Sequence, residues 1–394
     1  MEYCFAERMS KTPRSFIREI LKVTEQPDII SFAGGLPNPL AFPVPELARA
    51  TELVLEKEGV SALQYATTEG FLPLREWICD RYKKRYNLDV SPEEVLITHG
   101  SQQSLDLCGK VLIDKGTRVA IERPGYLGAI QAFSLFEPEF YPVNLENDGP
   151  SLQEVKISMD EGGCRLFYGV PNSQNPSGVT WSDEKRIKIA EYLTEYDSLF
   201  IEDDAYGEIR FSEKISSPVK KLAYDNVILN GTFSKIISPG MRMGWICAPK
   251  DIITHLVTAK QATDLHSSIF AQRIINRYLA EYPVDEYIKK ISDKYRMLCD
   301  CMVTAIKEML PASITFRIPD GGMFLWISLP TGCSSLDLFN HALEKGVAVL
   351  PGIPFYTNGG GENTMRLNFT NSSPEKITEG VRRLSVVLKE MGVD

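Results

Sequence analysis

The chain has 394 residues, of which 43% are hydrophobic, and this length allows two or three domains with a large buried core. Its formal net charge of −9 gives no electrostatic reason to expect nucleic acid or an anionic membrane as a partner. No apolar run reaches membrane-spanning length, and the first residues lack the hydrophobic core of a signal peptide.

The eight cysteines are scattered, and only Cys299 and Cys301 lie close together in the sequence. No Cys-x-x-Cys pair and no Cys/His metal spacing is present, so we expect neither a disulfide framework nor a metal site. Reduced thiols of this kind are typical of a cytoplasmic protein.

The first 40 residues contain a short helical pattern and a glycine turn. Apolar residues in 15–21 predict a helix, with Arg14 and Arg18 on one face, for which a solvated face is the plain interpretation. The run 29–32 predicts a strand leading into a turn that contains Gly34 and Gly35. Two glycines allow a ligand to approach the backbone closely, although an ordinary turn also explains them.

A helix is predicted at about 45–57, and a loop containing Tyr65 follows. From 94 to 282, predicted strands and helices alternate, which is typical of an α/β domain. The strand 95–98 ends in His-Gly-Ser-Gln at 99–102, before a helix. A Gly-Ser turn at a helix N-terminus can bind an anion, because free backbone N–H groups and the helix dipole point towards it.

Further polar residues follow the next predicted strands. The strand 118–122 precedes Tyr126, and the strand 165–170 ends in a Pro-Gly turn that contains Asn175. The strand 198–201 ends in Glu-Asp-Asp-Ala-Tyr, where alternation places Ile201 and Asp203 on one face of the sheet and Glu202 and Asp204 on the other. A buried carboxylate there is costly unless it meets a cation.

The most specific stretch follows the predicted strand 227–229. It contains Thr232 and Ser234, then Lys235, a Pro-Gly turn and Arg242. Hydroxyl groups and a guanidinium suit a phosphate, and a partly buried lysine beside a cation has a lowered pKa and a reactive amine. A surface lysine beside a serine-rich turn is the alternative.

After a predicted antiparallel strand at 241–248, helical patterns cover about 250–281 and 285–310, and residues 314–394 form a smaller α/β unit. Arg366 lies within the apolar strand 365–369. A buried arginine requires a carboxylate or a dense set of hydrogen bonds, so it either forms an internal salt bridge or binds a ligand.

These motifs together resemble the class I/II aminotransferases of fold type I, which use pyridoxal 5′-phosphate (PLP), and especially the 2-aminoadipate and kynurenine aminotransferases. The resemblance covers nearly the whole chain; Thr232 stands where serine is commoner and keeps the hydroxyl. It implies a large domain, 46–284, with a central, mostly parallel, seven-stranded sheet. The smaller α/β domain then combines the N-terminal segment 1–45 with 285–394.

The resemblance also assigns roles to individual residues. Lys235 carries the cofactor and acts as general acid and base, Asp203 keeps the pyridine nitrogen protonated, and Tyr126 stacks on the ring. Asn175 and Tyr206 contact the phenolic oxygen. The remaining cofactor-binding residues it implies are Ser101, Gln102, Thr232, Ser234, Arg242 and, from the partner subunit of a homodimer, Tyr65.

For the substrate, the resemblance implies that Arg366, with Gly35 and Asn175, holds the α-carboxylate. Arg18 would meet the distal carboxylate of an acidic substrate. The expected reaction moves an amino group from an L-amino acid (2-aminoadipate, glutamate, aromatic or branched-chain) to a 2-oxo acid such as 2-oxoglutarate.

Three alternatives differ from this expectation. A PLP-dependent lyase or decarboxylase shares the fold, but Arg366 and Gly35 favour transamination. A regulator with an aminotransferase-like domain needs an N-terminal helix-turn-helix, and the Gly34-Gly35 turn begins too early to leave room for one. A cofactor-free binding protein would not need Lys235 and Asp203 together.

Overall fold

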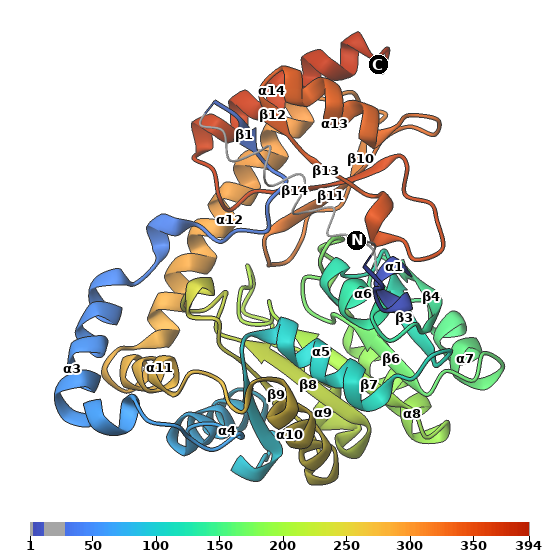
Figure 1. Ribbon diagram of the computed structural model, residues 1–394. Coiled ribbons are helices and arrows are strands. Elements are labelled where there is room, and N and C mark those ends of the chain that lie inside the picture. The colour runs from blue at the N-terminus through green and yellow to red at the C-terminus, as the bar shows by residue number, and fades with distance from the viewer. Residues whose placement is uncertain (1–2, 12–27, 394) are drawn as a thin grey trace.

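The computed structural model describes residues 3–11 and 28–393, and it divides into a larger and a smaller α/β part (Figure 1). The long helix α12 runs from the larger part into the smaller one. The helix predicted at 15–21 lies outside the described residues. The α-helices are α1 (Glu7–Lys11), α3 (Val44–Ala62), α4 (Leu72–Tyr86), α5 (Ser101–Leu112), α6 (Leu127–Ser134), α7 (Leu152–Asp160), α8 (Asp183–Glu195), α9 (Val219–Leu222), α10 (Lys250–Asp264), α11 (Ile269–Glu281), α12 (Val284–Met309), α13 (Ser335–Glu344) and α14 (Pro374–Glu390).

The larger part is built on one sheet in the order β2-β9-β8-β7-β6-β3-β4-β5. Its strands are β2 (Val95–Thr98), β3 (Arg118–Arg123), β4 (Glu139–Glu146), β5 (Gly149–Pro150), β6 (Leu166–Gly169), β7 (Leu199–Asp204), β8 (Val227–Thr232) and β9 (Gly244–Cys247). The five strands from β8 to β4 are parallel, and β9 is antiparallel to both neighbours, as predicted. The count is eight rather than seven because the two-residue strand β5, too short for any sequence pattern, pairs with β4 at the edge.

Alternation along the strands places two apolar layers on opposite faces of this sheet. Phe167, Phe200 and Val227 belong to one cluster, which includes side chains of α7, α8 and α9. Their neighbours Tyr168, Ile201 and Ile228 belong to the other, which includes side chains of α5 and α6. Helices therefore cover both faces, and polar side chains at the strand ends remain available for a site.

The smaller part combines segments from both ends of the chain. Its antiparallel sheet has the order β10-β11-β14-β13, and β1 pairs in parallel with β12. These strands are β1 (Ile30–Ser31), β10 (Thr315–Phe316), β11 (Phe324–Ser328), β12 (Val347–Ala348), β13 (Leu350–Pro351) and β14 (Thr364–Asn368). Short 3₁₀ helices occur at η1 (Pro39–Ala41), η2 (Pro92–Glu94), η3 (Tyr224–Asn226), η4 (Pro239–Met241) and η5 (Ile353–Phe355).

The helical pattern at 250–281 forms two helices, because a tight turn interrupts it between α10 and α11. Leu265 has φ 64° and ψ −59°, and the N–H of His266 donates to the carbonyl of Asp264 at 2.7 Å. These values describe a γ-turn. Ser268 then caps α11, with its hydroxyl accepting from the N–H of Ala271.

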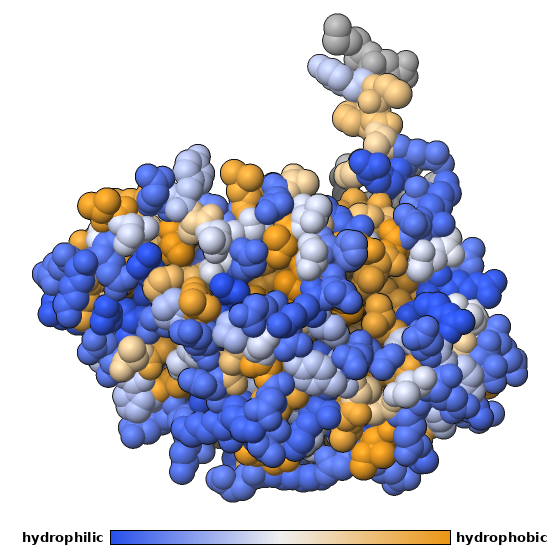
Figure 2. Space-filling view, turned by 90° about the horizontal axis from the view of Figure 1, so that it is seen from below, coloured by the Kyte–Doolittle hydropathy of each residue, from blue (hydrophilic) through white to orange (hydrophobic). Residues whose placement is uncertain are grey.

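Viewed from below, the molecular surface is mainly hydrophilic, with hydrophobic residues scattered in small groups (Figure 2). Within the described parts of the chain, no helix combines the length and apolarity that crossing a bilayer requires.

Candidate active site

A cavity of about 370 Å³ lies where the parallel strands end and the smaller part meets the larger one. Ligands in open α/β sheets bind at the carboxyl ends of the strands. All the predicted site residues except Tyr65 and Arg18 line this one cavity. They are Gly35, Ser101, Gln102, Tyr126, Asn175, Asp203, Tyr206, Thr232, Ser234, Lys235, Arg242 and Arg366.

The Lys235 amine points across the cavity from the segment that follows β8. Its Nζ donates to the carbonyl oxygen of Gly35 at 3.3 Å. Burial lowers the pKa of Lys235 to about 8, and the positive charges of Arg366 and Arg242 add to the effect. A substantial fraction of this amine is therefore neutral near pH 8 and able to attack a carbonyl.

Asp203 lines the cavity, and one of its carboxylate oxygens has no partner among the described residues. Its Oδ2 accepts from the hydroxyl of Tyr168 at 2.8 Å, while the buried Oδ1 has no hydrogen-bond partner among the residues the structure describes. Burial raises the pKa of Asp203 to about 7, and the Tyr168 hydrogen bond opposes this rise. Because an unpaired buried carboxylate oxygen is costly, the site fits a ligand that brings a cationic donor.

Glu202 points to the opposite face of the sheet, as alternation predicts. Its two oxygens accept from the backbone N–H groups of Val219 at 3.0 Å and Lys220 at 2.9 Å. Glu202 is thus fully buried beneath α9 and has structural partners, whereas Asp203 is left for the cavity.

Arg366 is buried in β14, and the alternative of an internal salt bridge is not supported. Within the described ranges no carboxylate pairs with it. Its Nη1 donates to Asn175 Oδ1 at 2.8 Å and its Nη2 to the carbonyl of Ala33 at 2.7 Å, while Nε has no partner among the residues described by the structure. The Phe324 ring lies 4.2 Å from the guanidinium carbon. Burial lowers the pKa of Arg366 to about 10, so it stays charged at neutral pH and suits a carboxylate ligand.

Asn175 links this arginine to Tyr206, because its Nδ2 donates to the Tyr206 hydroxyl at 3.5 Å. Gly35 leaves space on the same side of the cavity. A Cβ placed on Gly35 would lie at ordinary distances of 3.5 Å from Phe324 and 3.9 Å from Arg366. The protein itself therefore does not exclude a side chain there, and the open space belongs to the cavity.

Several anion-binding groups gather at another end of the cavity. The Thr232 and Ser234 hydroxyl oxygens lie 3.0 Å apart, and Ser101 is the first residue of α5. Arg242 donates from Nη2 to the His99 carbonyl at 3.4 Å. Gly100 has φ 73°, and a Cβ on it would approach Arg242 Nη2 to 2.7 Å, so only glycine fits. Hydroxyls, a helix N-terminus and a guanidinium together fit a phosphate group.

Tyr65 and Arg18 are not placed in this cavity. Tyr65 is 78% exposed and its ring lies edge-on to His266, with centroids 5.8 Å apart. Arg18 lies outside the described residues. The prediction that each contributes to a site is therefore not tested by the structure.

Sequence reasoning missed five residues: Leu36, Val170, Ala205 and Pro239, which line the cavity, and Tyr168, which contacts Asp203. The apolar lining residues carry no chemical signal of their own. Tyr168 lies on the neighbouring strand and on the same face as Asp203, but this placement depends on the register of the two strands and has no local sequence signal.

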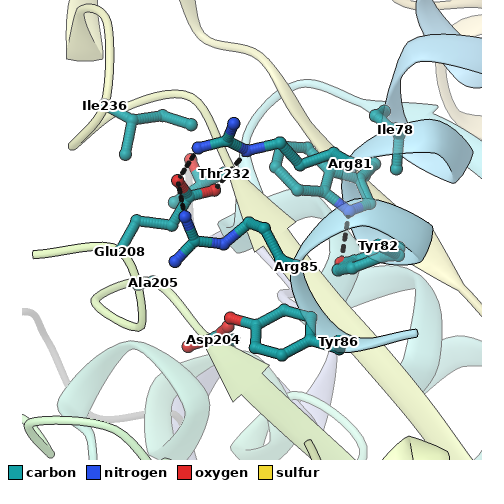
Figure 3. A pocket seen from close by; sticks show the side chains of 11 residues that line it. Ile78, Arg81, Tyr82, Arg85, Tyr86, Asp204, Ala205, Glu208, Thr232 and Ile236 are labelled. Atoms are coloured by element: carbon teal, nitrogen blue, oxygen red, sulfur yellow. Dashed lines mark hydrogen bonds and ion pairs between the residues drawn. The ribbon is translucent and has the colours of Figure 1, made fainter. Parts of the chain in front are cut away.

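A second, much smaller cavity of about 20 Å³ lies behind the first and shares Thr232 and Ala205 with it. Figure 3 shows Arg81 and Arg85 of α4 directed towards Glu208. Arg81 also pairs with Asp285 at the start of α12, with 2.6 Å between Nη1 and Oδ1. Ion pairs line this small space. We therefore interpret it as a structural contact that holds the segment carrying Tyr206, and not as a ligand site.

Comparison with known proteins agrees with this geometry. The family model described as aminotransferase class I and II matches residues 27–384. The chain is 41% identical to aromatic-amino-acid aminotransferase 1 of Thermococcus litoralis, over 99% of this chain and 95% of the relative. It is also 41% identical to the 2-aminoadipate transaminase of Thermus thermophilus, over 98% and 96%.

A solved structure of alpha-aminoadipate aminotransferase from Thermus thermophilus, complexed with N-(5′-phosphopyridoxyl)-L-leucine, matches with a TM-score of 0.93. It is 40% identical, and the match covers 98% of this chain and 97% of that one. The relatives named here are aminotransferases, which decides against the lyase and decarboxylase alternative, and enzymes of this class use PLP. The chain therefore belongs to the class I and II aminotransferases.

Proposed function

We propose that this aminotransferase holds PLP in the 370 Å³ cavity with Lys235 as covalent anchor and proton carrier. One observation carries the proposal: Lys235 lines the same cavity as Asp203, whose Oδ1 has no partner among the described residues, and Arg366, which has no carboxylate partner among them. When bound, PLP supplies an electron sink for the charge left at Cα once the proton there is removed.

Each protein group then has a defined task. Asp203 Oδ1 would face the ring nitrogen and keep it protonated, and Asn175 Nδ2 and the Tyr206 hydroxyl would orient the phenolic oxygen. Tyr126 would cover the ring. The phosphate would be held by Ser101, Gln102, Thr232, Ser234 and Arg242.

Lys235 moves the substrate proton, and Arg366 fixes the geometry of the transfer. Held by its α-carboxylate at Arg366 beside Gly35 and Asn175, the amino acid presents Cα to Lys235 Nζ. Nζ would remove the proton at Cα and act as the acid that gives it back, PLP would supply the site that keeps the amino nitrogen, and hydrolysis would then release a 2-oxo acid.

The amino donor is proposed from the relatives, which are named for aromatic amino acids and 2-aminoadipate. We propose that donors of both kinds are used, with 2-oxoglutarate as acceptor. The test is a panel of amino donors and 2-oxo acids followed through the absorbance of the bound cofactor. Release of CO₂ or of a product that retains nitrogen, without 2-oxo acid, would contradict transamination.

A homodimer with shared sites is proposed from the surface around Tyr65. Leu63, Tyr65 and Leu265 are 72%, 78% and 56% exposed, on two loops joined by the Ala66 N–H, which donates to His266 at 3.3 Å. Exposed apolar side chains of this kind suit a contact with a second copy. Sedimentation should therefore show a dimer.

Tyr65→Phe should weaken PLP binding about tenfold, because it removes a hydrogen bond to the phosphate.

Mixed dimers show whether Tyr65 contributes to the active site of the partner subunit or to that of its own subunit. If Tyr65 acts in the partner's site, a dimer of one Lys235→Ala chain and one Tyr65→Phe chain has one unaltered site and half the wild-type activity. If Tyr65 acts in its own subunit, both sites are defective. A fully active monomer would refute the dimer.

The N-terminal segment is proposed to select acidic substrates through Arg18. A dicarboxylic substrate on Arg366 needs a second cation for its distal carboxylate. Arg18→Ala should lower the kcat/KM ratio of 2-aminoadipate to leucine about tenfold or more, as expected for one lost charged contact. Arg14→Ala is the matched control and should leave this ratio unchanged. An unchanged ratio for Arg18→Ala would instead show that Arg18 does not select the substrate, as expected for a solvated arginine.

We also propose residues 46–284 as the cofactor-binding domain and 1–45 with 285–394 as the smaller domain. The parallel pairing of β1 with β12 supports this division. A cytoplasmic location is proposed because all eight cysteines are free thiols, which suits a reducing compartment.

A further inference from the structure

Tyr168 is a buried tyrosine whose hydroxyl is directed at the carboxylate of Asp203. It belongs to β6 and is fully buried, and its ring packs edge-on against Phe133 with centroids 5.7 Å apart. The hydroxyl donates to Asp203 Oδ2 at 2.8 Å. Tyr168 does not line the cavity, so it can reach a bound cofactor only through Asp203.

This is the one hydrogen bond that the Asp203 carboxylate makes within the described part of the chain. On the other side of Asp203, its register partner in β8 is Asn230. The amide of Asn230 is buried and neither its nitrogen nor its oxygen has a partner among the described residues. The strands on either side of Asp203 therefore supply one donor to its carboxylate, and that donor is Tyr168.

The bond determines how Asp203 faces the cavity. With Oδ2 held by Tyr168, the carboxylate cannot rotate freely, and Oδ1 is the oxygen left without a partner in the described part of the chain. A hydroxyl donor to a carboxylate also favours its charged form over its neutral form. Burial acts in the opposite direction and raises the pKa of Asp203 to about 7. Tyr168 thus fixes orientation and charge together.

We infer that Tyr168 is a positioning residue that holds Asp203 ionised, with Oδ1 aimed at the protonated ring nitrogen of PLP. The inference rests on the proposed role of Asp203 towards the cofactor. Phenylalanine would give the same ring contacts, so what the tyrosine adds at this point is the hydrogen bond from its hydroxyl to Asp203.

The test is Tyr168→Phe, which removes one oxygen and keeps the ring packed against Phe133. Full-length apoenzyme is titrated with PLP and, separately, with 1-deaza-PLP, in which carbon replaces the ring nitrogen. Binding is read from cofactor absorbance, so activity is not needed. The dissociation constant for PLP should rise about tenfold or more, because Asp203 loses the donor that favours its charged form and orients it, and that for the deaza analogue should rise less than twofold.

Tyr224→Phe is the matched control. The Tyr224 hydroxyl also donates to a carboxylate at 2.8 Å, that of Glu94, which directly precedes β2 at the opposite end of the strand from Ser101. Removing it should change neither dissociation constant. An equal loss for PLP and the deaza analogue in Tyr168→Phe would overturn the inference and leave Tyr168 a packing residue, and so would no loss for either.

Asp203→Ala separates failure of this inference from failure of the proposed function. If Asp203 faces the ring nitrogen, Asp203→Ala should abolish the preference for PLP over the deaza analogue. Combining Tyr168→Phe with Asp203→Ala should then cause no further change in either dissociation constant. A preserved preference in Asp203→Ala would refute the proposed role of Asp203. A lost preference in Asp203→Ala with a normal preference in Tyr168→Phe would refute the role of Tyr168 alone.

Discussion

Replacing Lys235 by alanine is expected to slow transamination by roughly two to four orders of magnitude through loss of the general acid and base alone, beyond the loss of the covalent anchor. The reason is geometric as well as chemical. The Lys235 amine lies in the same cavity as Asp203 and Arg366, and in the proposed reaction this one group both anchors the cofactor and moves the proton. Steady-state rates with a good amino donor, measured at saturating PLP, give the size of the effect.

Chemical labelling identifies the lysine independently of activity. Borohydride treatment of the PLP-loaded wild type should fix the cofactor on the peptide that contains Lys235, and on no peptide of Lys235→Ala. Lys220 and Lys260 serve as internal controls, because burial also lowers the pKa of each and neither lines the cavity. Label on either of them would show that the assignment of Lys235 is wrong.

The pH dependence of cofactor attachment follows from the same environment. Only the neutral amine attacks the carbonyl, so attachment should be slow below the pKa of Lys235 and should accelerate as pH rises through it. Burial and the charges of Arg366 and Arg242 place that pKa at about 8, below the usual 10.5. The rate of absorbance change after mixing apoenzyme with PLP, measured from pH 6.5 to 10, should therefore level off above about 8.

Much of the cavity could be predicted from the sequence, because its signals are local. The carboxylate of Asp203, the amide of Asn175 and the amine of Lys235 each lie within a few residues of the end of a predicted strand, and parallel strands end at one edge of a sheet. Alternation alone assigned Asp203 and Glu202 to opposite faces, and the structure confirms it.

What could not be predicted depends on contacts between distant residues or on turns without a signature. The Tyr168 hydrogen bond requires the register of β6 and β7, which no local pattern gives. The break between α10 and α11 occurs at Leu265, a residue that favours helix and not a turn at positive φ. Most of the cavity's apolar lining, including Val170, resembles any other core residue in sequence.

Arg366→Lys is expected to weaken binding of amino acids by about 10- to 100-fold while leaving the dissociation constant of PLP within about threefold. Lysine keeps the charge but loses the guanidinium fork, which is worth roughly 1.5–3 kcal/mol towards a carboxylate. The guanidinium of Arg366 is held by Asn175, by Ala33 and by the face of Phe324, so it is oriented before substrate arrives. The ammonium group of a lysine cannot keep these contacts and also bind a carboxylate in a bidentate manner.

The chemical control for Arg366 is the substrate without its α-carboxylate. The amine that corresponds to a good amino donor should bind the wild type weakly. Its affinity should not fall further in Arg366→Lys, because the amine has no α-carboxylate for Arg366 to contact. Binding is followed through the absorbance of the bound cofactor for both ligands. An equal loss for the amino acid and the amine, or a matching loss of PLP affinity, would mean that Arg366 supports the cavity through Asn175 and does not hold the substrate.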